Sequence, residues 1–360
     1  MKIEKGRISS TQLMFLIIGL LEGSTLTAAS IGEVTKKSTW LVLLLSLGIS
    51  LPLILVCTSL SEKFPCKNLI EINDVIYGRY FGKIMSILYI FYFWLIILAN
   101  LRLVADFFSI YLFPETHISV FIILITTLCL YTIRKGIEVI VNTGFVLTVL
   151  TIIIGVFISV VTVGEINLSN FLPLFQINLK DFVQGINLMV AIPFGDTVVF
   201  LMFYPYVNEI KQVKKSALWG LILGGMYFLS VGFRNLAILG ELAFIHGFPS
   251  YQIAALINIG EFISRMEALI AVIMLFNLFL KICIFYYATT LSAAQFLKLR
   301  SYKPLVSLIG IITIVFSLSV VSSPEKESYI LANIYPIYAI PFVVLFPIIS
   351  LTIAYIKEQG

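Results

Sequence analysis

Long apolar runs follow one another along almost the whole chain, separated by short polar loops. Ten such runs reach roughly 20 residues, the length that crosses about 30 Å of hydrocarbon as a helix. They cover residues 10–31, 39–60, 84–113, 117–133, 139–163, 184–207, 214–240, 267–296, 304–322 and 334–356. The pattern therefore predicts an all-α integral membrane protein with about ten transmembrane helices.

The composition supports one membrane domain without a separate soluble domain. Of the 360 residues, 60% are hydrophobic and only 12% are charged, and a water-soluble core cannot bury so much apolar surface. No polar stretch is long enough to fold separately, so we expect a single polytopic membrane domain over residues 1–360. The first run follows three basic residues, as in a signal peptide, but nine further runs favour a retained first helix.

The positive charges predict the orientation in the membrane. If the N-terminus is cytoplasmic, sixteen of the 24 Lys and Arg residues fall on the cytoplasmic side, five fall on the other side, and three lie within spans. Loops rich in Lys and Arg stay in the cytoplasm, so we expect both termini to be cytoplasmic, with 211–215 inside and 165–180 outside. The lipid bilayer is the expected partner surface. No basic surface interleaved with aromatic residues indicates nucleic-acid binding.

Two of the ten runs are interrupted near their middle. In the first run an acid, Glu22, lies among glycines and hydroxyl residues within 19–25, and in the sixth run Pro193 is followed by a glycine and an acid. Proline lacks a backbone donor and glycine relaxes the dihedral angles, so both places favour unwound backbone. Within a bilayer such backbone must face protein, water or ligand. The candidate ligand-binding residues of the two breaks are Glu22, Gly23, Ser24, Phe194, Gly195 and Asp196.

The two interruptions occupy equivalent places if the spans form two halves of five. The pseudo-repeats would cover roughly 8–163 and 184–357, and an odd number of spans inverts the second half relative to the first. Paired interruptions in inverted halves are typical of a transporter with a central binding site. The pattern thus predicts a 5+5 inverted repeat with broken helices 1 and 6. The alternative is that glycine and proline merely kink or pack these helices.

Polar residues on the third span form two groups. Arg102 and Asp106 are four residues apart, so we expect an ion pair on one helical face, which serves either as a structural contact or as a gate. Tyr92, Ile96 and Asn100 follow helical spacing and either face the central pocket or form a packing stripe. All three are candidate ligand-binding residues.

A lysine lies near the middle of the eighth span. Lys281 follows Asn277 by one turn, and both are candidate ligand-binding residues. An intramembrane charge also needs a partner. We expect Lys281 to pair with Glu22 or Asp196, and its protonation to depend on conformation because burial opposes its charge while a carboxylate favours it. The alternative is a lysine that extends along its stem to the membrane interface.

Charged residues also gather around the outer ends of the seventh and eighth spans. We expect Arg234 to pair with one of the acids there. Residues 249–264 read as a short amphipathic helix with Ser250 as its cap, which acts either as a lid or as an ordinary surface helix. The acids concerned are Glu241, Glu261 and Glu267.

The chain offers little for catalysis or metal binding. It has only two histidines, His117 and His246, and four cysteines, which suggest neither a disulfide framework nor a metal site. No nucleophile and base occur in a recognisable constellation. We therefore expect no enzyme activity, no catalytic residues and no cofactor.

Several motifs together resemble a known family. They are the glycine-rich first helix, the break at 193–195 followed by Phe203-Tyr204-Pro205, and Ile263-Ser264-Arg265-Met266-Glu267 at the start of the eighth span. In span order, loop lengths and motifs, nearly the whole chain resembles the spore germination permeases. These are the B subunits of germinant receptors, of the GerAB type, within the amino acid–polyamine–organocation superfamily.

The resemblance implies a ten-helix inverted-repeat fold with a ligand pocket between broken helices 1 and 6 and helices 3, 8 and 10. It also implies residence in the inner membrane of the spore, a small-molecule germinant, and germinant receptor A and C subunits as partners. Because sodium-coupled members of the superfamily hold a cation beside the first break, Lys281 would stand in for that ion. Glu22 departs from the small residues usual at this break, and would either pair with a ligand amine or obstruct a ligand carboxylate.

The expected function is that of a germinant receptor B subunit that binds a small nutrient and signals germination. Apolar walls with an acid and an amine suit an amino acid better than a sugar or nucleoside. One alternative is an autonomous proton-coupled amino acid transporter, which would use the same pocket. Another is a ligand-opened ion channel, although the chain lacks a repeated selectivity-filter motif.

Overall fold

The fold is almost entirely helical. The computed structural model describes residues 4–25, 28–173, 177–244, 247–256, 266–319 and 324–359, and within these ranges it contains no named strand. The α-helices are α1 (Ser10–Gly23), α2 (Ala28–Thr35), α3 (Thr39–Lys63), α4 (Leu69–Phe107), α5 (Ile118–Lys135), α6 (Ile137–Val161), α7 (Leu179–Met189), α8 (Ile210–Leu239), α9 (Pro249–Leu256), α10 (Met266–Phe296), α11 (Lys303–Ser319), α12 (Pro324–Asn333), α13 (Tyr335–Ile340) and α14 (Phe346–Gln359).

The ten predicted spans coincide with the apolar helical segments. Among the described residues, 8 segments are long and apolar enough to cross a membrane: Gly32–Lys63, Leu69–Leu112, Ile118–Lys135, Ile137–Val161, Leu179–Met202, Ile210–Phe244, Met266–Phe296 and Tyr335–Lys357. The other two predicted spans contain the shorter apolar helices α1 and α11. The predicted all-α membrane architecture is confirmed.

Both predicted helix breaks are present. The helix α1 begins with a capping box between Ser9 and Gln12 and ends at Gly23, so the predicted span 10–31 is divided between α1 and α2. In the sixth span α7 ends at Met189, and Ile192 has extended backbone (φ −136°, ψ 125°) before a 3₁₀-helix starts. The break precedes a proline, which disfavours helical backbone at the residue before it.

The third helix is longer than the predicted span 84–113. It begins at Leu69, where Asn68 and Glu71 form a capping box, and it bends at Gly78. Gly78 has φ 75°, a left-handed conformation that glycine adopts without steric cost. The apolar run therefore predicted the membrane-crossing part of α4 but not the polar turns that precede the bend.

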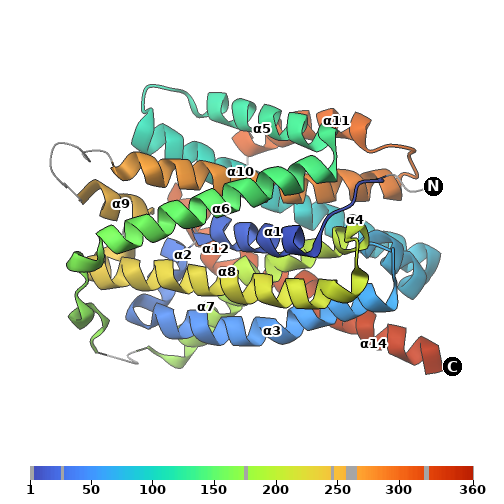
Figure 1. The fold of residues 1–360 in the computed structure, drawn as a ribbon, viewed down its shortest axis with the longest axis horizontal. Coiled ribbons are helices and arrows are strands. Elements are labelled where there is room, and N and C mark those ends of the chain that lie inside the picture. The colour runs from blue at the N-terminus through green and yellow to red at the C-terminus, as the bar shows by residue number, and fades with distance from the viewer. Residues whose placement is uncertain are drawn as a thin grey trace.

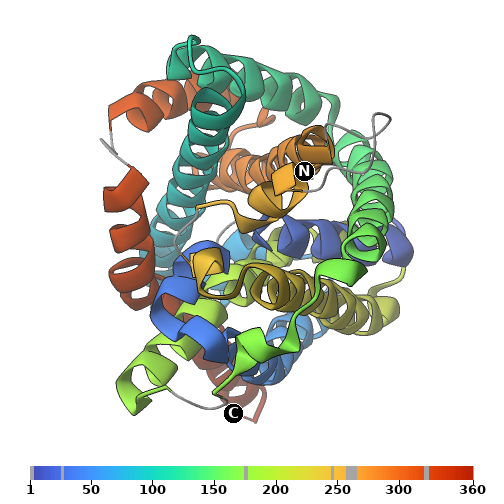
Figure 2. The ribbon, with the colours of Figure 1, turned by 90° about the vertical axis from the view of Figure 1, so that its left-hand side faces the viewer.

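The helices run roughly along one axis, with the N- and C-termini at one end of the molecule and α9 at the other (Figure 1). Viewed along the bundle from the α9 end, α10 (orange) lies between α4 (blue-green) and α6 (green) (Figure 2). The helix α10 packs against α4, α6 and α1, and α1 packs in turn against α8 and α6. The first and eighth spans therefore lie at the centre of the bundle.

The chain before α1 closes the end that holds the termini. Ile8 donates its amide to the Tyr206 carbonyl (2.9 Å) and accepts from the Asn208 amide (2.9 Å). The Glu4 carboxylate accepts a hydrogen bond from the Tyr302 hydroxyl (3.0 Å). Burial, together with the charge of Glu4, raises the pKa of Tyr302 above its usual value, so this phenol stays protonated and keeps donating.

Candidate functional site

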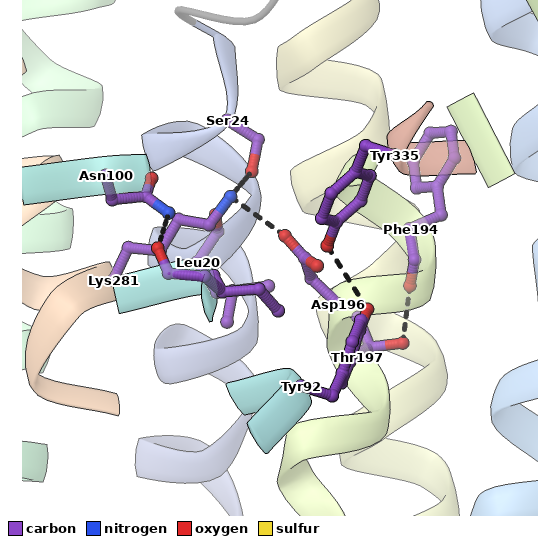
Figure 3. Close-up of polar contacts among 10 residues, drawn as sticks. Leu20, Ser24, Tyr92, Asn100, Phe194, Asp196, Thr197, Lys281 and Tyr335 are labelled. Atoms are coloured by element: carbon purple, nitrogen blue, oxygen red, sulfur yellow. Dashed lines mark hydrogen bonds and ion pairs between the residues drawn. The ribbon is translucent and has the colours of Figure 1, made fainter. Parts of the chain in front are cut away.

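A buried ion pair joins the two helix breaks to α10. Lys281 Nζ lies 2.9 Å from Asp196 Oδ2, and the two side chains are 2% and 1% exposed. Lys281 also donates to Ser24 Oγ at 2.6 Å (Figure 3). The ammonium extends from the middle of α10. It contacts Ser24, the residue that follows α1, and Asp196, in the first turn after the sixth-span break.

The choice between the two predicted partners of Lys281 is decided by packing. Asp196 contacts the ammonium, whereas Glu22 accepts a hydrogen bond from Thr151 Oγ1 of α6 at 2.6 Å. Glu22 is fully buried and its Oε1 has no hydrogen-bond partner in the part of the chain that the structure describes. Asn277 lies beside Glu22 without a well-aligned hydrogen bond to it. Glu22 is therefore a buried acid next to hydroxyl and amide groups, without a contacting cation among the described residues.

Aromatic side chains line the other side of Asp196. The Tyr335 hydroxyl lies near Asp196 and donates to the Tyr92 hydroxyl at 3.3 Å (Figure 3). The Tyr92 ring stacks on Phe342, with ring centroids 4.6 Å apart and 4° between the planes. Asp196 Oδ1 has no well-aligned partner among the described residues. The second oxygen of Asp196 is thus available to a hydrogen-bond donor.

The remaining polar candidates use part of their hydrogen-bonding capacity locally. The Asn100 amide donates to the Ile96 carbonyl at 2.7 Å, and both residues are buried in α4. Thr197 donates to the carbonyl of buried Phe194 at 2.6 Å, which satisfies one acceptor freed by the break. These contacts hold the local backbone; whether the candidates Ile96, Asn100 and Phe194 also contact a ligand stays a prediction.

The glycines at the breaks are places where helices approach closely. A β-carbon on Gly23 would lie 2.9 Å from the Asn277 carbonyl oxygen, and one on Gly195 would lie 2.5 Å from the Val190 carbonyl oxygen and 2.8 Å from Val343. Real β-carbon contacts are longer than these distances. Close packing thus explains why both positions are glycine. That their backbone approaches a ligand stays a prediction.

The predicted ion pair on the third span is present. Arg102 Nε lies 2.8 Å from Asp106 Oδ2, and the two side chains are 13% and 11% exposed. Both residues lie in the last two turns of α4. Mutual neutralisation explains this pair without a ligand, and a gating role stays a prediction.

The expected acidic partner of Arg234 is wrong for Glu241 and Glu267, whereas Glu261 lies outside the described residues. Its guanidinium donates to Ser159 Oγ (3.3 Å), Asn235 Oδ1 (3.2 Å) and Ser250 Oγ (2.9 Å), and none of its contacts in the described ranges is a carboxylate. Glu241 instead pairs with Lys37 at 3.1 Å, because its side chain lies at the surface, away from the buried guanidinium.

The outer amphipathic helix is described only in part. The helix α9 covers Pro249–Leu256, and the rest of the predicted range, with Glu261 and Arg265, lies outside the described residues, as does His246. Ser250 lies within α9 rather than before it, and its hydroxyl bonds to Arg234 and Asn235. The predicted cap is therefore a tertiary contact instead.

Besides Thr197, three polar residues of the site were not among the sequence candidates. Thr151 was detectable as one of two hydroxyls on an otherwise apolar face of the fifth span, and Tyr335 as an aromatic hydroxyl at the start of the tenth. Tyr227 of α8 lies close enough to both Glu22 and Arg234 to interact electrostatically with each. Tyrosines and threonines are common in membrane helices, so only their position in the fold distinguishes these three.

The geometry favours binding over catalysis. Among the described residues, no three His, Cys, Asp or Glu side chains come together as metal ligands would. The site offers an ammonium, two carboxylates and several hydroxyls, buried among aromatic rings. Such groups recognise a small polar or zwitterionic molecule through charge-assisted hydrogen bonds.

Comparison with known proteins supports a membrane transporter architecture. A crystal structure of MhsT in complex with L-phenylalanine matches 98% of this chain and 99% of its own, with a TM-score of 0.70 and 11% identity. Mhp1, a nucleobase-cation-symport-1 family transporter, matches 94% of this chain and 79% of its own, with a TM-score of 0.67 and 12% identity. The chain thus has the 5+5 inverted-repeat fold of these transporters, with helices 1 and 6 broken.

Sequence comparison identifies the family within that fold. The model of a family described as spore germination protein matches residues 7–324. Spore germination protein KB of Bacillus subtilis (strain 168) is 25% identical over 99% of this chain and 97% of its own length. The chain therefore belongs to the spore germination permease family.

Proposed function

We propose that this protein is the B subunit of a spore germinant receptor and binds a small nutrient germinant, an amino acid, at the centre of the bundle. Family membership supports the germination role, and the transporter fold supports a central binding site. The observation that carries the proposal is the Lys281–Asp196–Ser24 contact, which ties both broken helices to α10.

The same contact suggests how occupancy changes the protein. A ligand carboxylate that reaches Lys281 competes with Asp196 for the ammonium, and a ligand amine is drawn to Glu22 or to the free oxygen of Asp196. Either exchange alters the link between the two breaks. A ligand shifts a conformational equilibrium only if it binds one state better, and replacing an internal ion pair by ligand contacts provides such a difference.

The proposal extends to location and partners. We infer that the protein resides in the inner membrane of the spore with germinant receptor A and C subunits, and that 8–163 and 184–357 are its inverted repeats within one membrane domain. The two termini lie at the same end of the molecule (Figure 1), and the basic loops favour the cytoplasm for that end.

Cysteine labelling tests the orientation. Only Cys66 of the four cysteines is exposed. In a Cys66→Ser variant the remaining native cysteines are buried and should react little with a maleimide. In that background we expect Lys211→Cys to react with a membrane-impermeant maleimide only after permeabilisation, because position 211 lies in the basic inner loop. Lys180→Cys, near the start of α7, is the matched control and should react in intact cells. Labelling of position 211 in intact cells would contradict the topology.

A germination panel tests the function. Spores that lack this gene should lose the response to at least one amino acid and keep responses to sugars and nucleosides, because the site carries both an acid and an amine. Optical density after nutrient addition gives the measurement, with the restored gene as control. Loss of a sugar or nucleoside response alone would contradict an amino acid ligand.

The alternative of an autonomous proton-coupled transporter rests on Glu22, a buried acid that bonds to a hydroxyl. Proteoliposomes containing only this chain distinguish the two functions. A receptor subunit is expected to show no uptake of the active amino acid above empty liposomes under an inward proton gradient. Uptake that depends on the gradient and is lost in Glu22→Gln would favour the transporter.

A further inference from the structure

A second buried charge has no contacting carboxylate in the part of the chain that the structure describes. Arg234 of α8 is 6% exposed. Its contacts are a serine hydroxyl of α6, the neighbouring asparagine amide and a serine hydroxyl of α9, and its Nε–H has no acceptor among the described residues. All three acceptors are uncharged.

Such an arrangement is energetically costly unless an anion completes it. An arginine side chain does not deprotonate in proteins, and burying an ion costs several kcal/mol when no opposite charge compensates. Hydroxyl and amide dipoles offset only part of that cost. Guanidinium donors form a planar fork that suits a carboxylate. A small anion would therefore supply the negative charge that Arg234 lacks among the described residues.

The guanidinium lines a cavity that has room for one. The cavity measures about 30 Å³ and is bordered by Arg234 and Ser250 together with Thr25, Tyr227 and Tyr251. One water molecule requires about 10–15 Å³ by this measure, so the space accommodates a chloride ion or the carboxylate group of a larger ligand. The cavity lies beneath α9, at the end of the bundle opposite the termini (Figure 1).

The cavity adjoins the central site but is distinct from it. Thr25 borders the cavity and directly follows Ser24, which contacts Lys281. Tyr227 borders the cavity as well and lies close enough to Glu22 to interact with it electrostatically. Thr25 and Tyr227 thus connect the cavity to the residues of the central site.

We propose that Arg234 and the Ser250 hydroxyl form a binding site for a small monovalent anion, either a ligand carboxylate or chloride. The guanidinium supplies the charge and Ser250 holds it in place from α9. The site goes beyond the proposed function, because it requires neither germination signalling nor transport.

Anion-dependent thermal unfolding of the purified full-length protein in detergent tests the site. The reference buffer contains only sulfate, a larger dianion, and acetate or chloride replaces it at constant ionic strength. We expect acetate or chloride to raise the melting temperature saturably, and Arg234→Gln to abolish the rise. Lys37→Gln is the matched control: it removes a partly exposed cation that pairs with Glu241 and should leave the rise unchanged.

The two anions distinguish the possible ligands. A saturable rise in melting temperature with acetate alone assigns the site to ligand carboxylates, and a saturable rise with chloride assigns it to inorganic halide. Should Arg234→Gln fail to fold, Ser250→Ala carries the test, because it keeps the charge and should weaken the apparent anion affinity at least several-fold. No saturable rise in the wild-type protein, or an equal rise in both site variants, would overturn the proposal.

Discussion

Lys281→Met is expected to lower the free energy of unfolding by about 3–5 kcal/mol, the usual loss when one partner of a buried ion pair is removed. The reason is that Asp196, 1% exposed, would stay buried without the ammonium that contacts it at 2.9 Å, and would have to remain as an unpaired charge or take up a proton. Thermal unfolding of the purified protein in detergent measures the loss. An unchanged melting temperature for Lys281→Met would show that the pair does not stabilise the fold.

A double-mutant cycle identifies the partner. Combining Lys281→Met with Asp196→Asn should recover part of the lost stability, with a coupling energy of about 0.5–3 kcal/mol. Glu22→Gln is the matched control, because Glu22 is equally buried but bonds to Thr151. Coupling to Glu22 instead of Asp196 would contradict the assignment of the ion pair.

The same variants separate stability from signalling. If the ion pair links ligand occupancy to the broken helices, the Lys281→Met/Asp196→Asn protein should accumulate better than Lys281→Met yet still fail to trigger germination. Restored germination in the double variant would mean that the pair serves the fold alone. Protein level in spores and the nutrient response together give this comparison.

Gly195→Val should destabilise the protein by about 1–3 kcal/mol or more, the cost of inserting side-chain atoms into a packed core. Its first side-chain carbon would lie 2.5 Å from the Val190 carbonyl oxygen and 2.8 Å from Val343, and neither a helix backbone nor a β-branched side chain yields easily. Both the protein level and the melting temperature should fall. The close packing at this glycine accounts for such a loss without any contact to a ligand.

Gly48→Ala supplies the control for the glycine prediction. Gly48 lies within α3, and a β-carbon there would meet no atom within 4 Å. Alanine favours helix over glycine by roughly 0.5–1 kcal/mol, so this variant should be as stable as the wild type or more so. A normal melting temperature for Gly195→Val would show that the sixth-span break can rearrange around a side chain.

The order of helices and the two breaks could be predicted from the chain because their causes are local. A bilayer requires about 20 consecutive apolar residues for each helical crossing, and the predicted span 267–296 matches α10, Met266–Phe296, almost residue for residue. Proline and glycine act on their own and adjacent backbone, so the interruption near Pro193 was visible in one short stretch. The pair Arg102–Asp106 was equally accessible, since one helical turn brings the two side chains together.

Contacts between helices depended on the tertiary structure. The sequence left Lys281 with two possible partners, and only the rotation and approach of α1, α10 and the sixth helix placed Asp196, rather than Glu22, beside it. Arg234 shows the same limit, because acids at the outer ends of spans seven and eight suggested an ion pair, and among the described residues it contacts only uncharged groups. Hydropathy, proline and glycine specify where a helix lies and where it breaks. Which side chains meet is decided by side-chain packing between distant segments, and no periodicity in the chain encodes that directly.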